Sequence, residues 1–160
     1  MHNYISYSDV DGSEFALKLA KCLAEGPPEI YPWLDKWNLI SGFDYDDQFV
    51  EAIRTCESLI FVMTMDSVQS YSGCKKEWTR ALKYKKWIIP LLVDPKAEQP
   101  YMLDPRQYVD FTVLSFNDGC TKLKNDLLWG RTPEGQLQFL KIRLMDAQRA
   151  LHHDHIAEIE

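Results

Sequence analysis

The sequence has no run approaching the roughly 18 consecutive apolar residues that a membrane-spanning helix needs. It also lacks a basic, apolar leader after Met1, so we expect no signal peptide. Basic residues are in the minority, with 18 Lys and Arg against 24 Asp and Glu and a net charge of −6. A nucleic-acid binder needs a basic surface, so this balance argues against nucleic acid as the main partner. The absences predict a cytoplasmic domain that binds neither membrane nor nucleic acid.

Cysteine is sparse and scattered. The four cysteines form no C-x-x-C pair and have no histidine at metal-ligand spacing: Cys22, Cys56, Cys74 and Cys120. This pattern argues against a zinc site, and we expect no metal. We interpret the four as free thiols of a reducing compartment.

Glycine-rich phosphate-binding loops are also missing. The chain contains 7 glycines, and neither G-x-G-x-x-G nor G-x-x-x-x-G-K-[ST] occurs. The G-x-S-x-G turn that carries the nucleophile of many hydrolases is absent too. These gaps exclude the common nucleotide-binding loops and this class of serine hydrolase.

The residues that are present predict an α/β fold. Short apolar runs alternate with longer amphipathic runs, which is typical of a parallel sheet flanked by helices. We expect strands at residues 4–7, 30–34, 58–63, 87–93 and 108–111. We expect helices at residues 11–25, 44–53, 72–85 and 117–129, and a loop at 35–43. Five alternating strands indicate a flavodoxin-like sheet, which binds ligands at the carboxyl ends of its strands.

The sequence divides into a domain of residues 1–130 and a separate amphipathic helix of residues 131–160. Thr132-Pro133-Glu134 is a strong helix start, with a capping residue, proline and an acid in order. Apolar residues then recur at 3-4 spacing, as in a coiled-coil seam: Leu137, Leu140, Leu144, Ala147 and Leu151. We interpret this segment as a linker helix that docks on the domain, dimerises, or leads into a sensor domain after residue 160.

Several blocks in residues 3–130 resemble the Toll/interleukin-1 receptor (TIR) domain. Residues 4–8, Tyr-Ile-Ser-Tyr-Ser, are similar to the family's first strand. Residues 33–45 resemble its second strand and the following BB loop. Residues 74–81 match the C-x-x-E-x-x-x-A of its third helix, and Ile-Ile-Pro-Leu at 88–91 is similar to a later strand. The order and spacing look most like bacterial TIR proteins that cleave NAD⁺.

The resemblance implies that Glu77 is the catalytic residue, because the helix glutamate is the key group in catalytic members of the family. Helix geometry is compatible with this role. Cys74, Trp78 and Ala81 define a core-facing stripe, and Glu77 falls at its margin, where a carboxylate is partly desolvated yet reachable from a cleft. The alternative is a surface glutamate paired with Arg80.

The resemblance also implies a set of substrate-binding residues: Tyr7, Ser8, Asp35, Trp37, Gly42, Tyr45 and Cys74. One position departs from the family pattern. Catalytic members often carry Trp four residues before the glutamate, where this chain has Gly73. Tyr71 or Trp37 can supply a ring instead, or a neighbouring copy can complete the site.

Charge is unevenly distributed. Residues 75–86 hold six cations against Glu77. This segment could bind a pyrophosphate, dock on the acidic face of another copy, or simply be a solvated basic helix face.

The function implied by the resemblance is that of an NAD⁺ nucleosidase. It would release nicotinamide and ADP-ribose or a cyclic ADP-ribose isomer, with NAD⁺ as substrate and no cofactor. Self-association with other TIR domains would activate it, in bacterial immune (anti-phage) signalling or NAD⁺ depletion. The alternative is a non-catalytic scaffold that acts through contacts between TIR domains.

Overall fold

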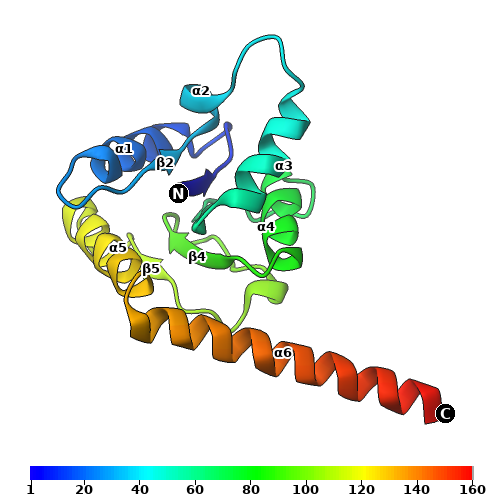
Figure 1. Ribbon diagram of the computed structural model, residues 1–160. Coiled ribbons are helices and arrows are strands. Elements are labelled where there is room, and N and C mark those ends of the chain that lie inside the picture. The colour runs from blue at the N-terminus through cyan, green and yellow to red at the C-terminus, as the bar shows by residue number, and fades with distance from the viewer. Residues whose placement is uncertain (160) are drawn as a thin grey trace. The chain divides into compact units, whose positions relative to one another are not determined.

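A five-stranded parallel sheet forms the centre of the fold, as the sequence predicts. The computed structural model describes residues 1–159 (Figure 1). Its strands are β1 (Asn3–Ser6), β2 (Pro32–Trp33), β3 (Ser58–Met63), β4 (Trp87–Leu92) and β5 (Val109–Asp110). The strand order β2-β1-β3-β4-β5 is that of flavodoxin-like folds, in which the crossover connections put helices on both faces of the sheet.

β3 is the central strand, and all six of its residues are buried. This accounts for its continuous apolar run, because a strand covered on both faces needs no alternation of polar and apolar residues. Ser58 is level with Asn3 of β1 and with Trp87 of β4. Pro32 lies in the edge strand β2, where a missing ladder donor is tolerated.

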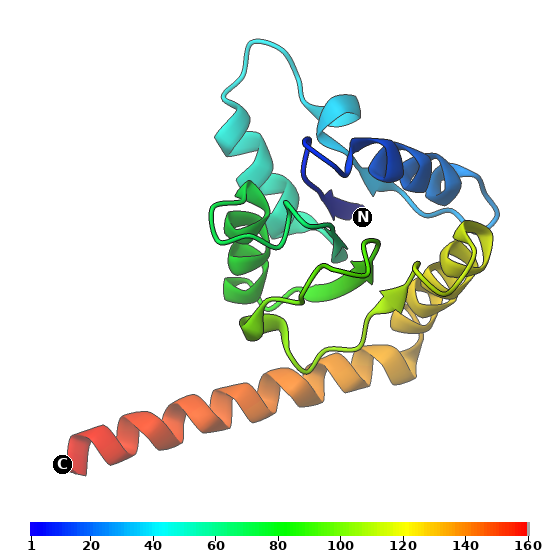
Figure 2. The same ribbon diagram turned by 180° about the vertical axis from the view of Figure 1, so that it is seen from behind.

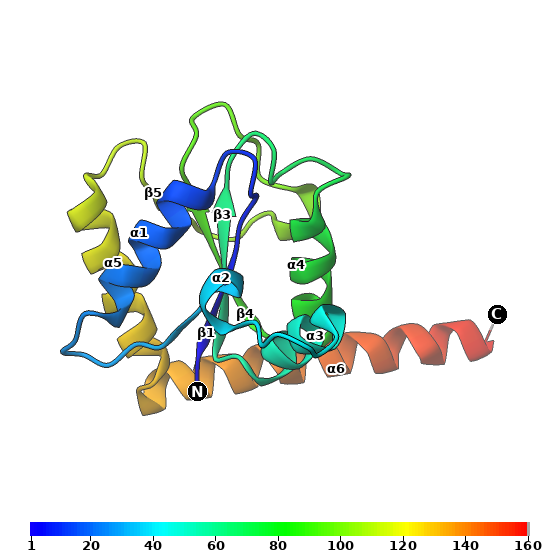
Figure 3. The same cartoon turned by 90° about the horizontal axis from the view of Figure 1, so that it is seen from above.

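Helices cover the two faces of the sheet (Figure 3). α1 (Ser13–Ala24) lies on one face, where it buries Ala16, Leu19, Ala20 and Leu23. α3 (Tyr45–Thr55) and α4 (Gly73–Lys83) lie together on the opposite face, and α4 buries Cys74, Trp78 and Ala81. The face that carries α3 and α4 is the one relevant to the functional site.

The segment expected to be a loop, residues 35–43, begins instead with the short helix α2 (Asp35–Asn38). Asn38 stabilises this turn because its Oδ1 accepts a hydrogen bond from the amide of Leu34 at 2.9 Å. The chain after α2 extends away from the sheet before it enters α3 (Figures 1 and 2). Gln48 of α3 holds this loop through hydrogen bonds to the amide and carbonyl of Ile40, at 2.7 and 3.1 Å.

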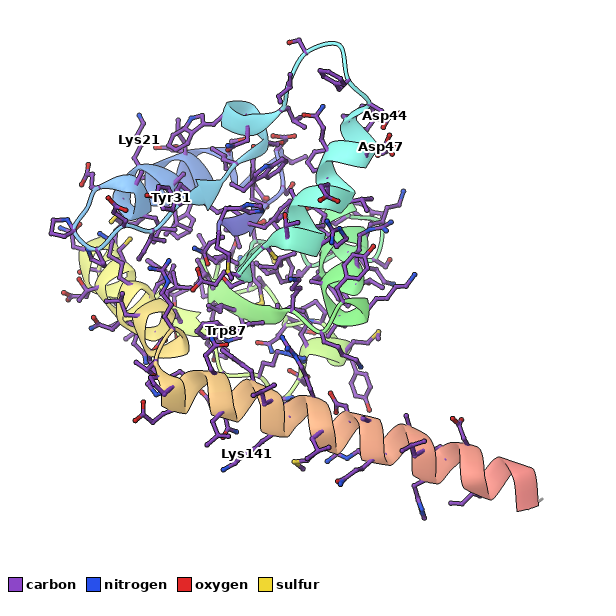
Figure 4. All side chains as sticks on the ribbon, in the orientation of Figure 1. Lys21, Tyr31, Asp44, Asp47, Trp87 and Lys141 are labelled. Atoms are coloured by element: carbon purple, nitrogen blue, oxygen red, sulfur yellow. The ribbon has the colours of Figure 1, made fainter. Side chains whose placement is uncertain are left out.

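The capping residues that begin α3 and α4 act as their types predict. Asp44 Oδ1 accepts from the amide of Asp47 at 3.0 Å, and both residues lie at the start of α3 (Figure 4). Ser72 Oγ accepts from the amide of Cys74 at 3.2 Å at the start of α4. Each cap satisfies a backbone donor that the first helical turn leaves free.

The chain divides into two compact units, the first of which is Met1–Leu123. The division falls inside α5 (Phe116–Gly130), and the second unit starts at Lys124 and contains α6 (Pro133–Ile159). Thr132 caps α6, since its Oγ1 accepts from the amide of Gly135 at 3.1 Å.

The helix predicted for residues 131–160 corresponds to α6, and Glu160 lies outside the described residues. The leucines of its seam are exposed: Leu137, Leu140, Leu144 and Leu151. Docking, dimerisation and a link to a further domain all stay predictions for this helix. In residues 1–159 we find no helix with the length and apolar character to cross a membrane.

Candidate active site

A cavity of about 740 Å³ opens at the carboxyl ends of β1 and β3. Its walls come from the loops that follow these strands, from the start of α2, and from α3 and α4. The carboxyl ends of parallel strands are where flavodoxin-like folds bind ligands. Ser8, Asp66 and Glu77 contribute polar groups from three different segments.

Glu77 of α4 points toward β1. Its Oε1 accepts a hydrogen bond from Ser6 Oγ at 2.9 Å, and its Oε2 accepts one from the hydroxyl of Tyr4. Tyr4 and Ser6 are alternate residues of β1, so both side chains leave the strand on the side that faces α4. Among the described residues Glu77 forms no ion pair with Arg80, the partner that a surface role would give it.

Burial raises the pKa of Glu77 to about 8. The two hydroxyl donors act in the opposite direction, because a hydrogen bond to a carboxylate favours its charged form. A carboxyl with this pKa is mostly protonated at neutral pH, yet it ionises readily when a cation approaches. Such a poised acid in a cleft is typical of catalytic sites.

Cys74 lines the same cavity one helical turn before Glu77. Burial raises the pKa of its thiol, an effect that the neighbouring Ser6 and Ser72 hydroxyls partly offset. The side chain therefore stays a neutral thiol at physiological pH. It shapes the wall of the cavity and does not supply a thiolate nucleophile.

Hydrogen bonds between segments fix the floor of the cavity. The Tyr7 hydroxyl donates to Asp35 Oδ1 at 2.5 Å, and Ser8 Oγ donates to Asp66 Oδ2 at 2.5 Å. Burial and the neighbouring Asp35 raise the pKa of Tyr7 above its ordinary value, so the phenol remains a donor. In the described part of the chain, no cluster of His, Cys, Asp or Glu is arranged to hold a metal ion.

The structure brings five of the predicted site residues to this cavity: Tyr7, Ser8, Asp35, Cys74 and Glu77. Trp37, Gly42 and Tyr45 lie outside its lining. Gly42 has φ +89°, a left-handed conformation that glycine adopts at little cost, and a Cβ built on it meets nothing within 4 Å. Tyr45 is 62% exposed and sets its ring edge against Phe49, as expected of an anchor for α3. A substrate contact for these three stays a prediction.

Comparison with known proteins identifies the family. The family model described as a TIR domain matches residues 4–124, about three quarters of the chain. The chain belongs to the TIR domain family. A search of curated proteins found no match for it.

Solved TIR structures share this fold. The TIR domain of the Toll-related receptor TRR-2 from Hydra magnipapillata matches with a TM-score of 0.62 and 22% identity, over 78% of this chain and 96% of that one. The TIR domains of the activated Roq1 resistosome match with a TM-score of 0.61 and 16% identity, over 79% and 98%. A prokaryotic SEFIR domain matches with a TM-score of 0.57 and 20% identity, over 80% and 98%.

Three further residues of this TIR domain belong to the site although the sequence alone did not predict them: Tyr4 and Asp66 line the cavity, and Ser6 donates to Glu77. Tyr4 is fully buried, and its ring stacks on Trp33 at 4.9 Å. The signal for Tyr4 and Ser6 was the two-residue period of β1, which puts them on one face. Asp66 accepts from both Ser8 and Tyr71, so it fixes the loop after β3.

Gly73 leaves an opening where catalytic members of the family often carry Trp. It lines the cavity, and a Cβ built on it meets nothing within 4 Å. Of the two rings considered as substitutes, Tyr71 lines the cavity and is 75% exposed, whereas Trp37 lies outside the lining. Tyr71 is therefore the better placed of the two to face a ligand.

Proposed function

We propose that this TIR domain cleaves NAD⁺ at the bond between nicotinamide and ribose. The observation that carries the proposal is the carboxyl of Glu77, partly buried, held by Tyr4 and Ser6, and facing a cavity of about 740 Å³. A cavity of this size suits a dinucleotide, since ligand pockets commonly measure about 300–1,000 Å³. The products are nicotinamide and ADP-ribose or a cyclic ADP-ribose isomer.

The reaction requires little from the protein beyond electrostatic stabilisation of the charge that develops on the ribose. The bond from the ribose C1′ to the pyridinium nitrogen breaks, and its electron pair neutralises the ring, which leaves as nicotinamide. The ribose then has the oxocarbenium character also found in glycoside hydrolysis. Water adds to C1′ and loses a proton to give ADP-ribose, or an atom of the same nucleotide adds and gives a cyclic isomer. The carboxylate of Glu77 stabilises the cation that develops.

The substrate itself helps to ionise Glu77. With a pKa of about 8, the free carboxyl is mostly neutral at pH 7. The pyridinium of NAD⁺ is a fixed positive charge, and a cation within about 4–6 Å lowers the pKa of a carboxyl. Binding therefore favours the carboxylate at the moment when the reaction needs it.

Self-association is the second part of the proposal. The loop between α2 and α3 exposes large apolar side chains, namely Ile40 at 62% and Phe43 at 72%. Trp37 and Tyr45 border this loop and are partly exposed, outside the cavity of their own chain. A neighbouring copy that contacts this loop would give these residues a role in self-association. The association would serve a signalling or NAD⁺-depleting response of a bacterial immune system. A scaffold without catalysis would use the same surface.

The deciding experiment is incubation of concentrated protein with NAD⁺, followed by chromatography of nicotinamide and the ADP-ribose products. Release of nicotinamide that rises more than in proportion to protein concentration supports both catalysis and activation by association. Concentrated protein that associates by light scattering yet releases no nicotinamide would instead favour the scaffold.

Tyr4→Phe should shift the pH dependence of cleavage upward. The variant keeps the ring stacked on Trp33 but removes one of two donors to the Glu77 carboxylate. Loss of a hydrogen bond to a charged group should raise the pKa of Glu77 by about one unit. The midpoint of the profile of kcat/KM against pH should rise by the same amount. Tyr101→Phe, at a 90% exposed position, is the control and should leave the midpoint in place.

Gly73→Trp should increase activity. The open space at Gly73 accepts a larger side chain, and an aromatic ring there would face a bound nicotinamide. Aromatic stacking predicts a rise in kcat/KM for NAD⁺ of roughly threefold to tenfold. Steady-state kinetics at one protein concentration tests this. A variant that melts like the wild type but is slower would argue that nicotinamide binds elsewhere in the cavity.

A further inference from the structure

The charges that line the cavity are unevenly placed. Five acidic residues line it, namely Asp9, Asp35, Asp46, Asp66 and Glu77, against two basic residues, Lys76 and Arg80. A site this acidic repels a ligand that carries only negative charge. Both basic residues of the lining belong to α4, so the two phosphates of a dinucleotide would pair with cations on that helix.

Lys76 and Arg80 lie side by side on α4. They are four residues apart, so their side chains leave the same strip of the helix, about 6 Å apart along its axis, on either side of Glu77 in sequence. Like charges at this spacing repel each other slightly. Among the described residues, neither of the two forms an ion pair with an acid, unlike Lys36 with Asp9 or Arg54 with Glu51.

A solvated basic helix face would explain some of these cations but not the whole arrangement. Lys75 and Lys83 are exposed on the same helix and lie outside the lining of the cavity. Lys76 and Arg80 differ because they reach the space that Glu77 faces. A paired, unneutralised positive edge inside an acidic cavity indicates a doubly charged anionic group as its partner.

We propose that Lys76 and Arg80 bind the pyrophosphate of the substrate and so select a dinucleotide over a nucleoside without phosphate. This inference rests on the proposed function. Two negative charges then lie beside Lys76 and Arg80, and the positive nicotinamide ring lies near Glu77 and Gly73 of the same helix. The cavity thereby fixes the direction in which the dinucleotide enters, with the scissile bond toward Glu77.

The test compares two double variants, each of which removes two positive charges from α4. Lys76→Gln with Arg80→Gln removes the cations of the cavity, whereas Lys75→Gln with Lys83→Gln removes two cations outside it. Since hydrogen bonds to charged groups are the strong ones, the first pair should raise the KM for NAD⁺ roughly 50-fold and change kcat little. Nicotinamide riboside carries no phosphate, so its kcat/KM should stay within about threefold of wild type. The control pair should leave both substrates nearly unaffected.

Calorimetry with ADP-ribose separates this inference from the proposed function, because binding needs no cleavage. Wild type should bind ADP-ribose, the cavity pair should bind it at least tenfold more weakly, and the control pair should bind it like wild type. Equal binding by the cavity pair and wild type, equal losses in both pairs, or no binding to wild type would each overturn the pyrophosphate site. Binding that depends on Lys76 and Arg80 in a protein that leaves NAD⁺ intact would refute the proposed catalysis and keep the site.

Discussion

Glu77→Gln should lower the rate of NAD⁺ cleavage by roughly 10²- to 10³-fold, the usual effect of removing a group that stabilises transition-state charge. Glutamine keeps the size of the side chain and can still contact Tyr4 and Ser6, but it offers no negative charge to the ribose cation. The measurement is nicotinamide release at saturating NAD⁺, so that the loss is seen in kcat. Rates close to wild type would remove Glu77 from the catalytic role.

The control for this variant is Glu14→Gln, an exposed acid of α1 whose loss changes the net charge equally. It should keep full activity. Thermal unfolding checks that the site variant is folded. Since folding raises the pKa of Glu77 from 4.5 to about 8, wild-type stability falls as pH rises between these two values. Glu77→Gln, which is neutral at every pH, should therefore melt no lower than wild type above a pH of about 8.

The second large effect is a steep rise of kcat/KM with pH. This quantity follows the ionisation of the free enzyme, and the carboxylate of Glu77 is the active form. With a pKa of about 8, kcat/KM at pH 6 should be about 100-fold below its alkaline plateau. The measurement is a series of initial rates between pH 6 and 9.5 at low NAD⁺, below the concentration that saturates the enzyme. A flat profile over this range would mean that Glu77 is already ionised in the free protein.

The sheet and its flanking helices were predictable because their signals are local. The apolar run of β3 and the capping residues Asp44 and Ser72 each depend on a few adjacent residues. The short helix α2 was missed because four residues carry too weak a period, and its stabilising contact comes from the side chain of Asn38.

The site was harder to predict than the fold. Glu77 could be singled out through the family resemblance, and its place at the margin of the buried stripe of α4 is compatible with that role. Its partners Tyr4 and Ser6 lie more than 70 residues away, and which face of β1 meets α4 is decided by the crossover of the chain. Trp37 and Tyr45 were expected at the ligand from family position; both lie outside the cavity lining, and a ligand contact for them stays a prediction.

The two edge strands limit how copies of this domain can associate. β2 and β5 contain two residues each, and Pro32 removes one amide donor from β2. Edges this short offer few free backbone groups, so pairing of sheets between copies gains few hydrogen bonds, and that route to aggregation is weak. Contacts between copies must then come from side chains on loops and helices, where one substitution can change an assembly without disturbing the sheet. The domain can therefore be concentrated, as its activation is proposed to require, with little tendency to form β-sheet aggregates.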